Sequence, residues 1–562
     1  MKQFMKTYRR ELLWAFVCTI VLLLPYLSRN FLPIEHDTFF HLSRIEGMAA
    51  SIRNGQFLPA IYPMKNNGYG YASPLFYCDI LLIPAALLYL LTGSISISYI
   101  VTVFVMSYAS LAAFGITARR ITKRTDVSFT AITASAFANY RITNIYVRGA
   151  LGEICAMAFL PILVYGLYQI LYEEEKDGRI AVCIGLSGLV CSHNLSFLFG
   201  VILTVIFFLL RVMHVQKESI RHLFEGIIAA FFLTAFFTLP MIEQLRSQQF
   251  YLHVTGSDLA SYTMQPWQYF ANTTVFGYGN NTYAKDQIMT VNPGWFLMAA
   301  PLLMHWRKET AEERFLQDCR IFGYIFLILP CSLIPWSYLG FASIVQFPWR
   351  LIMVSMTLLV LPAAVSIADL LKRRVLVLAM SLALCAEGIW HILPVYGRTF
   401  GITAATPYSA LIDGTVIDPY YSAFYVRTEL AGADYLPVGS PDFRKREAKI
   451  YCEDGPLDIE LRRMSTSSLF VLDEPHDLIE LPITWYQGYT MWHKDALGDF
   501  RIIPSGPSSQ RLVSIHTAEK GSYMLMYQNT AVQTLSRQVS MLALVVILFG
   551  KRLPTFQKLF KK

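Results

Sequence analysis

The segment RLIMVSMTLLVLPAAVSIADL, residues 350–370, is apolar almost throughout after its leading arginine. A helix that crosses a bilayer needs roughly 20 mostly apolar residues, because each backbone N–H and C=O must be satisfied within the helix. Similar stretches recur along the chain. We expect about thirteen of them, near residues 11–29, 75–92, 98–117, 127–142, 153–172, 179–194, 195–212, 223–242, 291–305, 320–339, 350–370, 375–393 and 537–550.

The composition agrees with a polytopic membrane protein of mainly α-helical fold. Hydrophobic residues make up 54% of the 562-residue chain and charged residues 15%. The mean hydropathy is +0.42, which is more apolar than an ordinary soluble protein. The net charge of +8 does not indicate nucleic-acid binding, because Lys and Arg gather at the ends of the predicted spans. Such clusters are typical of cytoplasmic loops.

The basic clusters also predict an orientation in the cell membrane. The cytoplasmic parts would be both termini and residues 119–124 and 372–374. The outer parts would be residues 30–74, 243–290 and 394–536. This arrangement requires that one apolar stretch between residues 75 and 117 does not cross, and we expect residues 75–92 or their neighbour to be re-entrant.

Residues 394–536 differ in character from the rest of the chain. Segments such as LDIELRRM (457–464) and GSYMLMY (521–527) alternate apolar and polar residues, and turn signals such as PSGPSS separate them. This pattern predicts antiparallel strands. We therefore expect a transmembrane domain over residues 1–393, an extracytoplasmic β-sandwich over 394–536, and a last transmembrane helix with a basic cytoplasmic tail over 537–562. Cys452 is the only cysteine in the outer segment, so no disulfide framework is expected there.

The stretch IEHDTFFHLSRIEG, residues 34–47, places several ionisable groups directly after the first apolar segment. If residues 37–52 are helical, Asp37, His41 and Arg44 fall on one face, beside an apolar stripe that includes Leu42. Such a helix is suited to lie along the bilayer surface. The free N–H groups of its first turn would keep Asp37 ionised. A role as a simple helix cap is the alternative, since Asp is common at that position.

Polar residues recur at the ends of other predicted spans. They are Tyr69 and Tyr71 in NGYGYASPLFY (67–77), Arg148 and Glu153 in YVRGALGE (146–153), His193 and Asn194 in CSHNLS (191–196), and Gln346, Trp349 and Arg350 in QFPWR (346–350). Ionisable groups in a membrane cost roughly 2.5 to 3.5 kcal/mol at mid-helix, which favours a functional role. Structural alternatives are an Arg148–Glu153 ion pair, a hydrogen-bonded core His193, and an interface anchor at Trp349.

Motifs of soluble enzymes are missing. The sequence has no P-loop, no G-x-G-x-x-G after a strand, no H-E-x-x-H and no C-x-x-C pair. Any chemistry must therefore come from the polar groups at the membrane face.

Six motifs in this order resemble a bacterial multi-spanning family labelled 6-pyruvoyl-tetrahydropterin-synthase-related membrane domain, which is similar to the GT-C glycosyltransferases. They are HDTFFHLSRI, GYGYASPLFY, YVRGALGE, SHNLS, QFPWR and GADYLP, between residues 36 and 437. The pterin label does not suit this chain, because the soluble synthase uses a histidine-ligated zinc site and the sequence has no such cluster.

The resemblance implies a GT-C fold and a sugar donor carried on a polyprenyl phosphate. In the enzymes it resembles, an acidic residue after the first span acts as general base or orients the acceptor. Asp37 occupies that place, and Glu35 is the substitute. Related oligosaccharyltransferases use a D-x-D pattern with a divalent metal. This chain has E-H-D in place of D-x-D, so the sequence does not decide whether a divalent metal binds there.

These observations predict transfer of a sugar from the polyprenyl-phosphate donor to a cell-envelope polymer or lipid acceptor at the outer face of the membrane. Asp37 would accept the acceptor's proton, and Arg148 or Arg350 would stabilise the leaving phosphate. The other residues expected to bind substrate are His36, His41, Arg44, Tyr69, Tyr71, Glu153, His193, Asn194, Gln346 and Trp349.

Two other functions fit the same pattern. Intramembrane Arg, Glu and His also line transport paths, so a transporter or flippase of lipid-linked saccharides is the main alternative. An assembly scaffold whose β-domain binds partners is the other.

Overall fold

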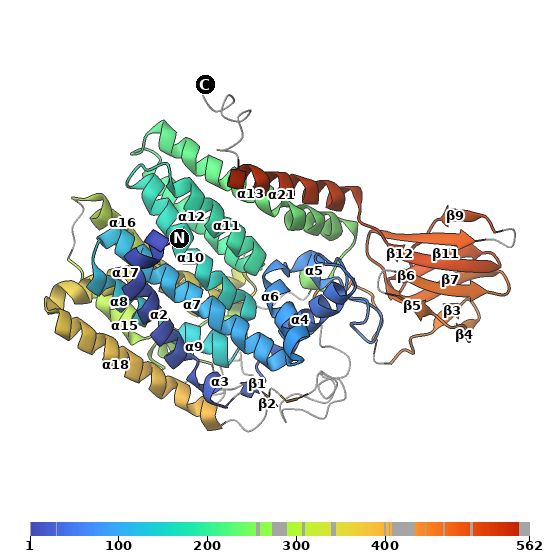
Figure 1. Cartoon of the computed structure of the whole chain (residues 1–562), viewed down its shortest axis with the longest axis horizontal. Coiled ribbons are helices and arrows are strands. Elements are labelled where there is room, and N and C mark those ends of the chain that lie inside the picture. The colour runs from blue at the N-terminus through green and yellow to red at the C-terminus, as the bar shows by residue number, and fades with distance from the viewer. Residues whose placement is uncertain are drawn as a thin grey trace. The chain divides into compact units, whose positions relative to one another are not determined.

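The structure is a computed structural model (Figure 1). It describes residues 2–29, 31–254, 259–271, 289–305, 309–338, 344–397, 401–403, 405–406, 433–443, 445–464, 467–494 and 498–549. The chain forms two compact units, each assembled from segments far apart in the sequence. The first contains residues 1–38, 94–231 and 256–406, and the second contains residues 39–93, 232–255 and 407–562.

The first unit is a helix bundle. Its α-helices are α1 (Lys2–Thr7), α2 (Arg9–Leu22), α3 (Leu24–Arg29), α7 (Ile95–Thr122), α8 (Thr125–Ala136), α9 (Asn139–Tyr146), α10 (Leu151–Leu171), α11 (Gly178–Ser192), α12 (Asn194–Arg211), α15 (Trp295–Ala299), α16 (Ala311–Ile328), α17 (Ile352–Leu371) and α18 (Arg374–Ile392). A short antiparallel pair joins β1 (Phe31–Pro33) to β2 (Gly401–Thr403). Helix α13 (Lys217–Ser247) is divided between the two units.

Helix α10 packs against α7 on one side and α11 on another. The contact with α11 is close because small residues face it. A Cβ added at Gly185 of α11 would lie 2.8 Å from the Cα of Leu163, so any side chain at Gly185 would push the helices apart. Close packing of this kind replaces the hydrophobic effect between helices in lipid.

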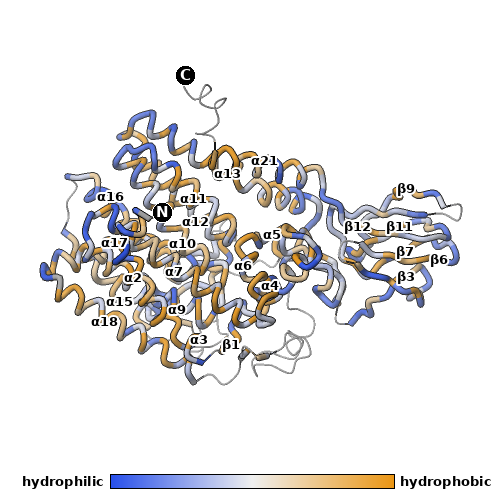
Figure 2. The backbone as a smooth tube through the Cα atoms, viewed as in Figure 1, coloured by the Kyte–Doolittle hydropathy of each residue, from blue (hydrophilic) through white to orange (hydrophobic). Residues whose placement is uncertain are grey.

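Among the described residues, seven helices are long and apolar enough to cross a membrane, so the protein is a multi-pass membrane protein. They are Ile95–Thr122, Leu151–Leu171, Asn194–Arg211, Lys217–Ser247, Pro348–Leu371, Val375–Gly397 and Ala531–Phe549. Figure 2 shows hydrophobic residues along several of these helices, α18 among them.

The sequence predicted more spans than these because hydropathy does not locate breaks in a helix. The predicted span 11–29 is divided into α2 and α3, and the predicted span 127–142 is divided into α8 and α9. Residues 291–305 contain the short α15 and the 3-10 turn η4 (Ala300–Leu303), which has Pro301 in its first turn.

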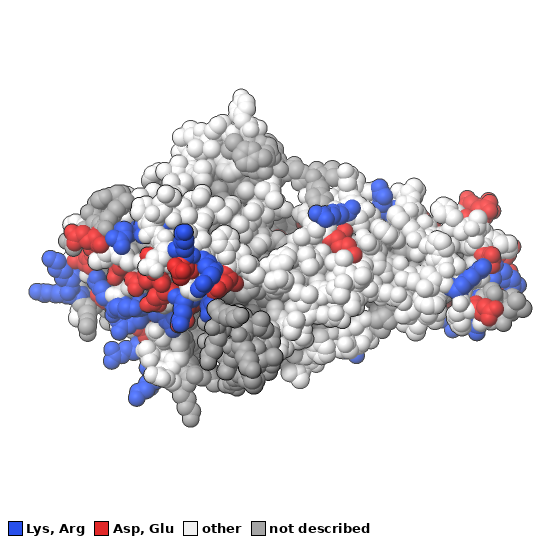
Figure 3. All heavy atoms as spheres, turned by 90° about the horizontal axis from the view of Figure 1, so that it is seen from above, with Lys and Arg blue, Asp and Glu red and all other residues white. Residues whose placement is uncertain are grey.

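The basic loops of the bundle meet at one end. Arg124, after α7, forms an ion pair of 2.5 Å with Asp369 near the end of α17. Residues 119–124 and 372–374 are therefore on the same side, as the charge rule predicts. Charged side chains gather at this end of the bundle on the face drawn in Figure 3. Arg148 and Arg350 precede α10 and α17, so they lie at the opposite end.

The second unit begins with α4 (Thr38–Arg53), α5 (Ser73–Phe76), η1 (Ile80–Leu82) and α6 (Ile83–Thr92). Helix α6 has 10 residues and is about 15 Å long at 1.5 Å per residue, too short to cross a bilayer core of about 30 Å. This agrees with the expectation that residues 75–92 or their neighbour do not cross the membrane.

Helix α4 is buried within the protein on both its apolar and its polar face, and a position along the bilayer surface stays a prediction. The predicted apolar stripe is buried at Leu42 and Ile45, but the polar face is buried as well at His41 and Arg44. The polar face of α4 does not contact water. Its Arg44 instead forms an ion pair with the buried carboxylate of Asp79.

The β-domain of the second unit is a sandwich of two antiparallel five-stranded sheets (Figure 1). One sheet has the order β10-β11-β7-β3-β4, with β10 (Gly506–Pro507), β11 (Leu512–Ala518), β7 (His476–Thr484), β3 (Ile450–Cys452) and β4 (Gly455–Leu457). The other has the order β5-β6-β12-β8-β9, with β5 (Arg462–Arg463), β6 (Ser467–Leu472), β12 (Gly521–Tyr527), β8 (Tyr489–Lys494) and β9 (Phe500–Ile503).

One core fills the space between the sheets. Ile479 and Leu481 from the first sheet pack with Phe470, Tyr523 and Leu525 from the second. The predicted C-terminal β-rich domain is thus confirmed, and alternation in GSYMLMY corresponds to strand β12. The last helix, α21, covers Ala531–Phe549 and begins six residues earlier than the predicted span.

Candidate functional site

Backbone contacts in the first unit hold Asp37 beside Arg148. The Asp37 N–H donates to the Arg148 carbonyl oxygen at 2.8 Å. The adjoining Gly149 has φ +59°, and a Cβ there would lie 2.8 Å from Thr38 Oγ1 and 3.1 Å from the Cβ of Glu35. Glycine is therefore needed both for the left-handed backbone and for the close approach of the two segments.

Glu153, in the first turn of α10, is the centre of a buried polar cluster. Its Oε1 lies 2.8 Å from Arg148 Nη1 and 3.2 Å from Arg350 Nε. Its Oε2 accepts hydrogen bonds from the Tyr140 hydroxyl at 2.8 Å and from Asn144 Nδ2 at 3.3 Å. One carboxylate thus fixes two guanidinium groups that come from distant parts of the chain.

Aromatic rings cover the two guanidinium groups. The Cζ of Arg148 lies 4.5 Å from the ring centroid of Trp349, and the Cζ of Arg350 lies 4.7 Å from that of Phe347. The rings of Phe347 and Trp349 stack at 5.2 Å. These distances suit cation–π contacts. The buried Nε1 of Trp349 donates to no other described residue.

Gln346 and His193 complete the cluster from neighbouring elements, and Asn194 is the first residue of α12, next to His193. Gln346 has φ +60°, which is uncommon for a residue with a side chain, and its Oε1 accepts from Arg350. His193 caps α12, where its Nδ1 accepts from the Ser196 N–H at 3.3 Å. His193 is also close enough to Glu153 for an electrostatic interaction. The Arg148–Glu153 ion pair, Arg350, Gln346 and the helix-capping His193 are therefore one assembly.

The electrostatics of the cluster favour a permanent cation beside Asp37. Burial opposes the charge of Arg148, but Glu153, then Tyr140 and Asp37, favour it, and the pKa of Arg148 is raised overall. Asp37 also interacts electrostatically with Arg350. Asp37 and His36 are half-buried, whereas Glu35 is buried and its Oε2 accepts from the Thr38 hydroxyl at 3.2 Å. Asp37 is thus the more accessible of the two predicted carboxylates.

His41 and Arg44 belong to a different network, in the core of the second unit. Arg44 Nε donates to Asp79 Oδ1 at 2.7 Å, and Arg44 Nη1 lies 3.1 Å from His41 Nδ1. The Tyr62 hydroxyl donates to the other Asp79 oxygen. Burial opposes the charge of Arg44, but Asp79 favours it, and the pKa of Arg44 is raised. These contacts place His41 and Arg44 in the buried core of the second unit, away from the Glu153 cluster, and a binding role for either residue stays a prediction.

Tyr71 is also part of the second unit's core. Residues Tyr62 and Tyr71 form an isolated β-bridge, and the Tyr71 hydroxyl accepts the Tyr435 N–H at 3.3 Å. Tyr71 is therefore fixed in the core of this unit, and the role of stacking on a sugar stays a prediction. Tyr69 is buried too and donates to the Glu447 carbonyl oxygen, but one edge of it lines a cavity.

The sequence reasoning missed Tyr140, Asn144 and Asp79. Tyr140, Asn144 and Arg148 are spaced at i, i+4 and i+8, a period that places side chains on one face of a helix. That spacing was the available signal for the first two. Asp79 follows the motif GYGYASPLFY by two residues, and nothing in the local pattern identifies Arg44 as its partner.

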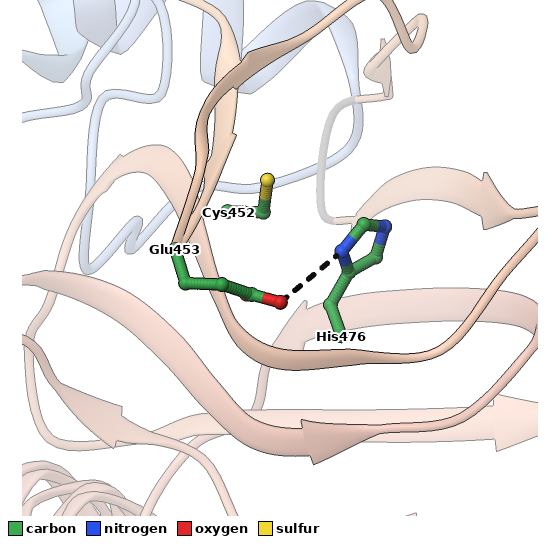
Figure 4. A group of neighbouring side chains, drawn as sticks. All are labelled: Cys452, Glu453 and His476. Carbon is green, nitrogen blue, oxygen red and sulfur yellow. Dashed lines mark ion pairs between the residues drawn. The ribbon is translucent and has the colours of Figure 1, made fainter.

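A possible metal site lies in the β-sandwich. The ligand atoms of Cys452, Glu453 and His476 all lie within 4.8 Å of one another (Figure 4). His476 Nδ1 is 3.6 Å from Glu453 Oε1, and the Glu453 carboxylate already accepts the N–H groups of Asp477 and Leu478. Within the described ranges, no comparable trio includes Asp37 or Glu35, so a metal at Asp37 stays an open prediction.

Comparison with known proteins gives distant similarities. No family model matches the sequence, so membership of the 6-pyruvoyl-tetrahydropterin-synthase-related family stays a prediction. An uncharacterised protein of Lactococcus lactis subsp. cremoris (strain MG1363) is 22% identical over 336 residues, which cover 57% of this chain and 53% of the relative. The chain therefore spans about half the length of this curated relative.

Two solved structures are similar at 12% identity. The mycobacterial arabinofuranosyltransferase AftD has a TM-score of 0.47, with 73% of this chain and 28% of AftD covered. The oligosaccharyltransferase AglB of Archaeoglobus fulgidus, solved with an inhibitory peptide and a dolichol-phosphate, has a TM-score of 0.39, with 79% of this chain and 62% of AglB covered. Neither score is high enough to establish a shared fold by itself.

Proposed function

We propose that the protein is a membrane glycosyltransferase of GT-C type that moves a sugar from a polyprenyl-phosphate donor to a cell-envelope polymer or lipid. The observation that carries the proposal is the cluster in the first unit. Arg148 and Arg350 share the buried Glu153, at 2.8 Å and 3.2 Å, and the half-buried Asp37 is hydrogen-bonded to the backbone of Arg148.

The arginines suit a lipid-phosphate leaving group. Arg148 comes just before α10, and Arg350 just before α17, both of which are long enough to span. Phosphate groups of membrane lipids lie at the ends of spans. Negative charge grows on the phosphate as the glycosidic bond breaks, and charge-assisted hydrogen bonds from guanidinium groups stabilise it. Glu153 and the rings of Trp349 and Phe347 hold these groups in place.

Asp37 suits the role of general base. It directly precedes α4 and is half-buried, so it is open to a substrate in a way that Glu35 is not. A carboxylate there accepts the proton of the acceptor hydroxyl as the oxygen attacks the anomeric carbon. The Trp349 N–H and His193 are further groups for orienting the sugar.

The direct test is transfer of a labelled sugar by the purified protein from a polyprenyl-phosphate donor to an envelope extract. Labelled product that depends on the protein supports the proposal. Movement of the labelled donor across a proteoliposome membrane without any transfer would favour the flippase alternative instead.

Arg350→Ala is expected to weaken donor binding by about ten- to hundredfold, the effect of losing a charge-assisted contact. Folding should be kept, because Glu153 retains Arg148, Tyr140 and Asn144 as partners. Arg350→Lys should recover part of the binding, since a point charge remains. Titration with donor lipid, with melting curves alongside, measures both.

Arg120→Ala is the matched control for Arg350. Arg120 is a half-buried arginine bonded to Tyr8 and Tyr165 at the other end of the bundle. The Arg120→Ala protein should bind the donor as tightly as the wild type does. Equal loss of donor binding in the two variants would contradict a phosphate-binding role for Arg350.

The proposed reaction takes place at the outer face, with the β-sandwich outside the cell membrane. The basic loops at the end of the bundle opposite Arg148 support this orientation. In a Cys452→Ser background, Glu474→Cys in an exposed turn of the sandwich should react with an impermeant maleimide in intact cells. Lys176→Cys, in the exposed loop after α10, should react only after lysis. The reverse pattern would contradict the orientation.

A further inference from the structure

The second unit contains a cavity of about 470 Å³ between the β-sandwich and the segment of residues 55–70. Strands β6, β8 and β12 form part of its wall, and the first turns of α21 form another part. Its lining includes Arg463, Arg537, Tyr489, Ser467, Ser468 and Phe57. None of these residues belongs to the Asp37 cluster of the first unit.

The cavity is positively charged. Arg463 donates to the carbonyl oxygens of Gly68 and Pro482, and Arg537 donates to that of Leu58 at 3.0 Å. In the described part of the chain, neither arginine forms an ion pair with a carboxylate. Burial lowers the pKa of Arg463, so its charge is held at a cost that a bound anion would offset.

No carboxylate among the lining residues neutralises the two arginines. A small neighbouring cavity of about 40 Å³ shares Arg537 and is lined by Asp79. Asp79 is already bound by Arg44 and by the Tyr62 hydroxyl. Its charge is therefore matched by Arg44, and the 470 Å³ cavity keeps its own positive charge.

Hydroxyl groups in the wall are free to bind an anion. The side-chain hydroxyls of Ser467, Ser468 and Tyr489 make no hydrogen bond to another residue of the described ranges. By contrast, the Tyr527 hydroxyl donates to Gln487 and accepts from Gln533. Ser468 pairs with Arg463 across β5 and β6, so the two side chains lie on the same face of the sheet, whereas Ser467 points to the other face. Guanidinium and hydroxyl groups are donors that suit the oxygens of a phosphate group.

The position of the cavity on the second unit indicates a lipid source for that phosphate. Arg537 lies six residues after the start of α21, a candidate span, which is about 9 Å along the helix and so within reach of lipid head groups. Leu535 and Leu542 of α21 are 61% and 64% exposed, as expected for a lipid-facing helix, and Phe57 at the cavity rim is 53% exposed.

We propose that this cavity binds the phosphate head group of an anionic membrane lipid. The guanidinium groups of Arg463 and Arg537 contact the phosphate oxygens, the hydroxyls of Ser468 and Tyr489 donate to the phosphate, and Phe57 meets the glycerol and acyl region. The site goes beyond the proposed sugar transfer and does not depend on it.

The test is native mass spectrometry of the full-length protein in detergent with added phosphatidylglycerol or phosphatidylcholine. The wild type should retain phosphatidylglycerol preferentially. Arg463→Gln with Arg537→Gln should lower its affinity about tenfold or more, because two charge-assisted contacts are lost. Arg462→Gln with Arg501→Gln, which changes two exposed arginines paired with Glu460 and Glu519, should bind as the wild type does.

Three results would overturn the proposal: no preference for phosphatidylglycerol, equal binding by the site variant and the control, or glycerol 3-phosphate binding as tightly as the lipid. The last would indicate a site for a free phosphate. Melting curves check folding, and Arg537→Gln alone, which loses one backbone contact, replaces the double variant if that variant unfolds. Retained sugar transfer in the site variant would separate this result from failure of the proposed function.

Discussion

Asp37→Asn is expected to lower sugar transfer by about 10²- to 10⁴-fold, the range for loss of a positioned general base. The amide keeps the shape of the carboxylate but cannot accept the acceptor's proton. Donor binding should persist, because Arg148, Arg350 and Glu153 are unchanged. Initial rates with a labelled polyprenyl-phosphate sugar, with donor titration in parallel, measure the two effects separately.

The structure supplies the controls for this prediction. Asn is as good a helix cap as Asp, so a capping role alone predicts little change in stability or transfer. Glu35→Gln changes a buried carboxylate two residues away, one that accepts from the Thr38 hydroxyl, and should be milder. An Asp37→Asn protein with near-normal turnover would remove Asp37 from the mechanism and leave Glu35 as the acid to test.

Glu153→Gln is expected to lower the free energy of unfolding by about 3 to 5 kcal/mol, the usual effect of removing one partner from a buried ion pair. Arg148 and Arg350 are both buried, and the substitution leaves them without the carboxylate that they share. Denaturant or thermal unfolding of the purified protein in detergent measures the change.

A half-exposed ion pair is the control for the loss of unfolding free energy in Glu153→Gln. Glu225 pairs with Arg179, both more than a third exposed, so Glu225→Gln should cost about 1 kcal/mol or less. Adding Arg350→Gln to Glu153→Gln should recover part of the stability, because one buried charge is removed as well. An equal loss of unfolding free energy in Glu153→Gln and Glu225→Gln would mean that water reaches the Glu153 cluster and that its ion pairs are not buried.

Much of the architecture follows from local patterns in the sequence. Length and hydropathy identify α10 and α17 as spans, and alternation identifies the strands of the sandwich. The sequence points to Arg148, Glu153 and Arg350 because ionisable groups beside spans are costly. The structure brings these three together with Trp349, although about 200 residues separate the two motifs.

The environments of Arg44 and Tyr71 could not be predicted, because they depend on contact residues that the local sequence pattern does not identify. Arg44 lies on a polar face of α4, a pattern that equally describes a helix at a membrane surface and one whose cation is buried against Asp79. Tyr71 sits in a glycine-rich segment that looks flexible, yet its bridge to Tyr62 closes that segment. In both cases a contact made over a distance in the sequence decides exposure, and local patterning cannot report it.

The backbone hydrogen bond between Asp37 and Arg148 has a mechanical consequence. The bond and the close approach at Gly149 tie the segments of these two residues together. Arg350 is attached to a different helix, α17. A shift of α17 along α10 would have to break the ion pair of Arg350 with Glu153, but it would leave the spacing of Asp37 and Arg148 unchanged. Such a shift would release a lipid phosphate bound between Arg148 and Arg350. Asp37 would keep its position beside Arg148 for the next turnover.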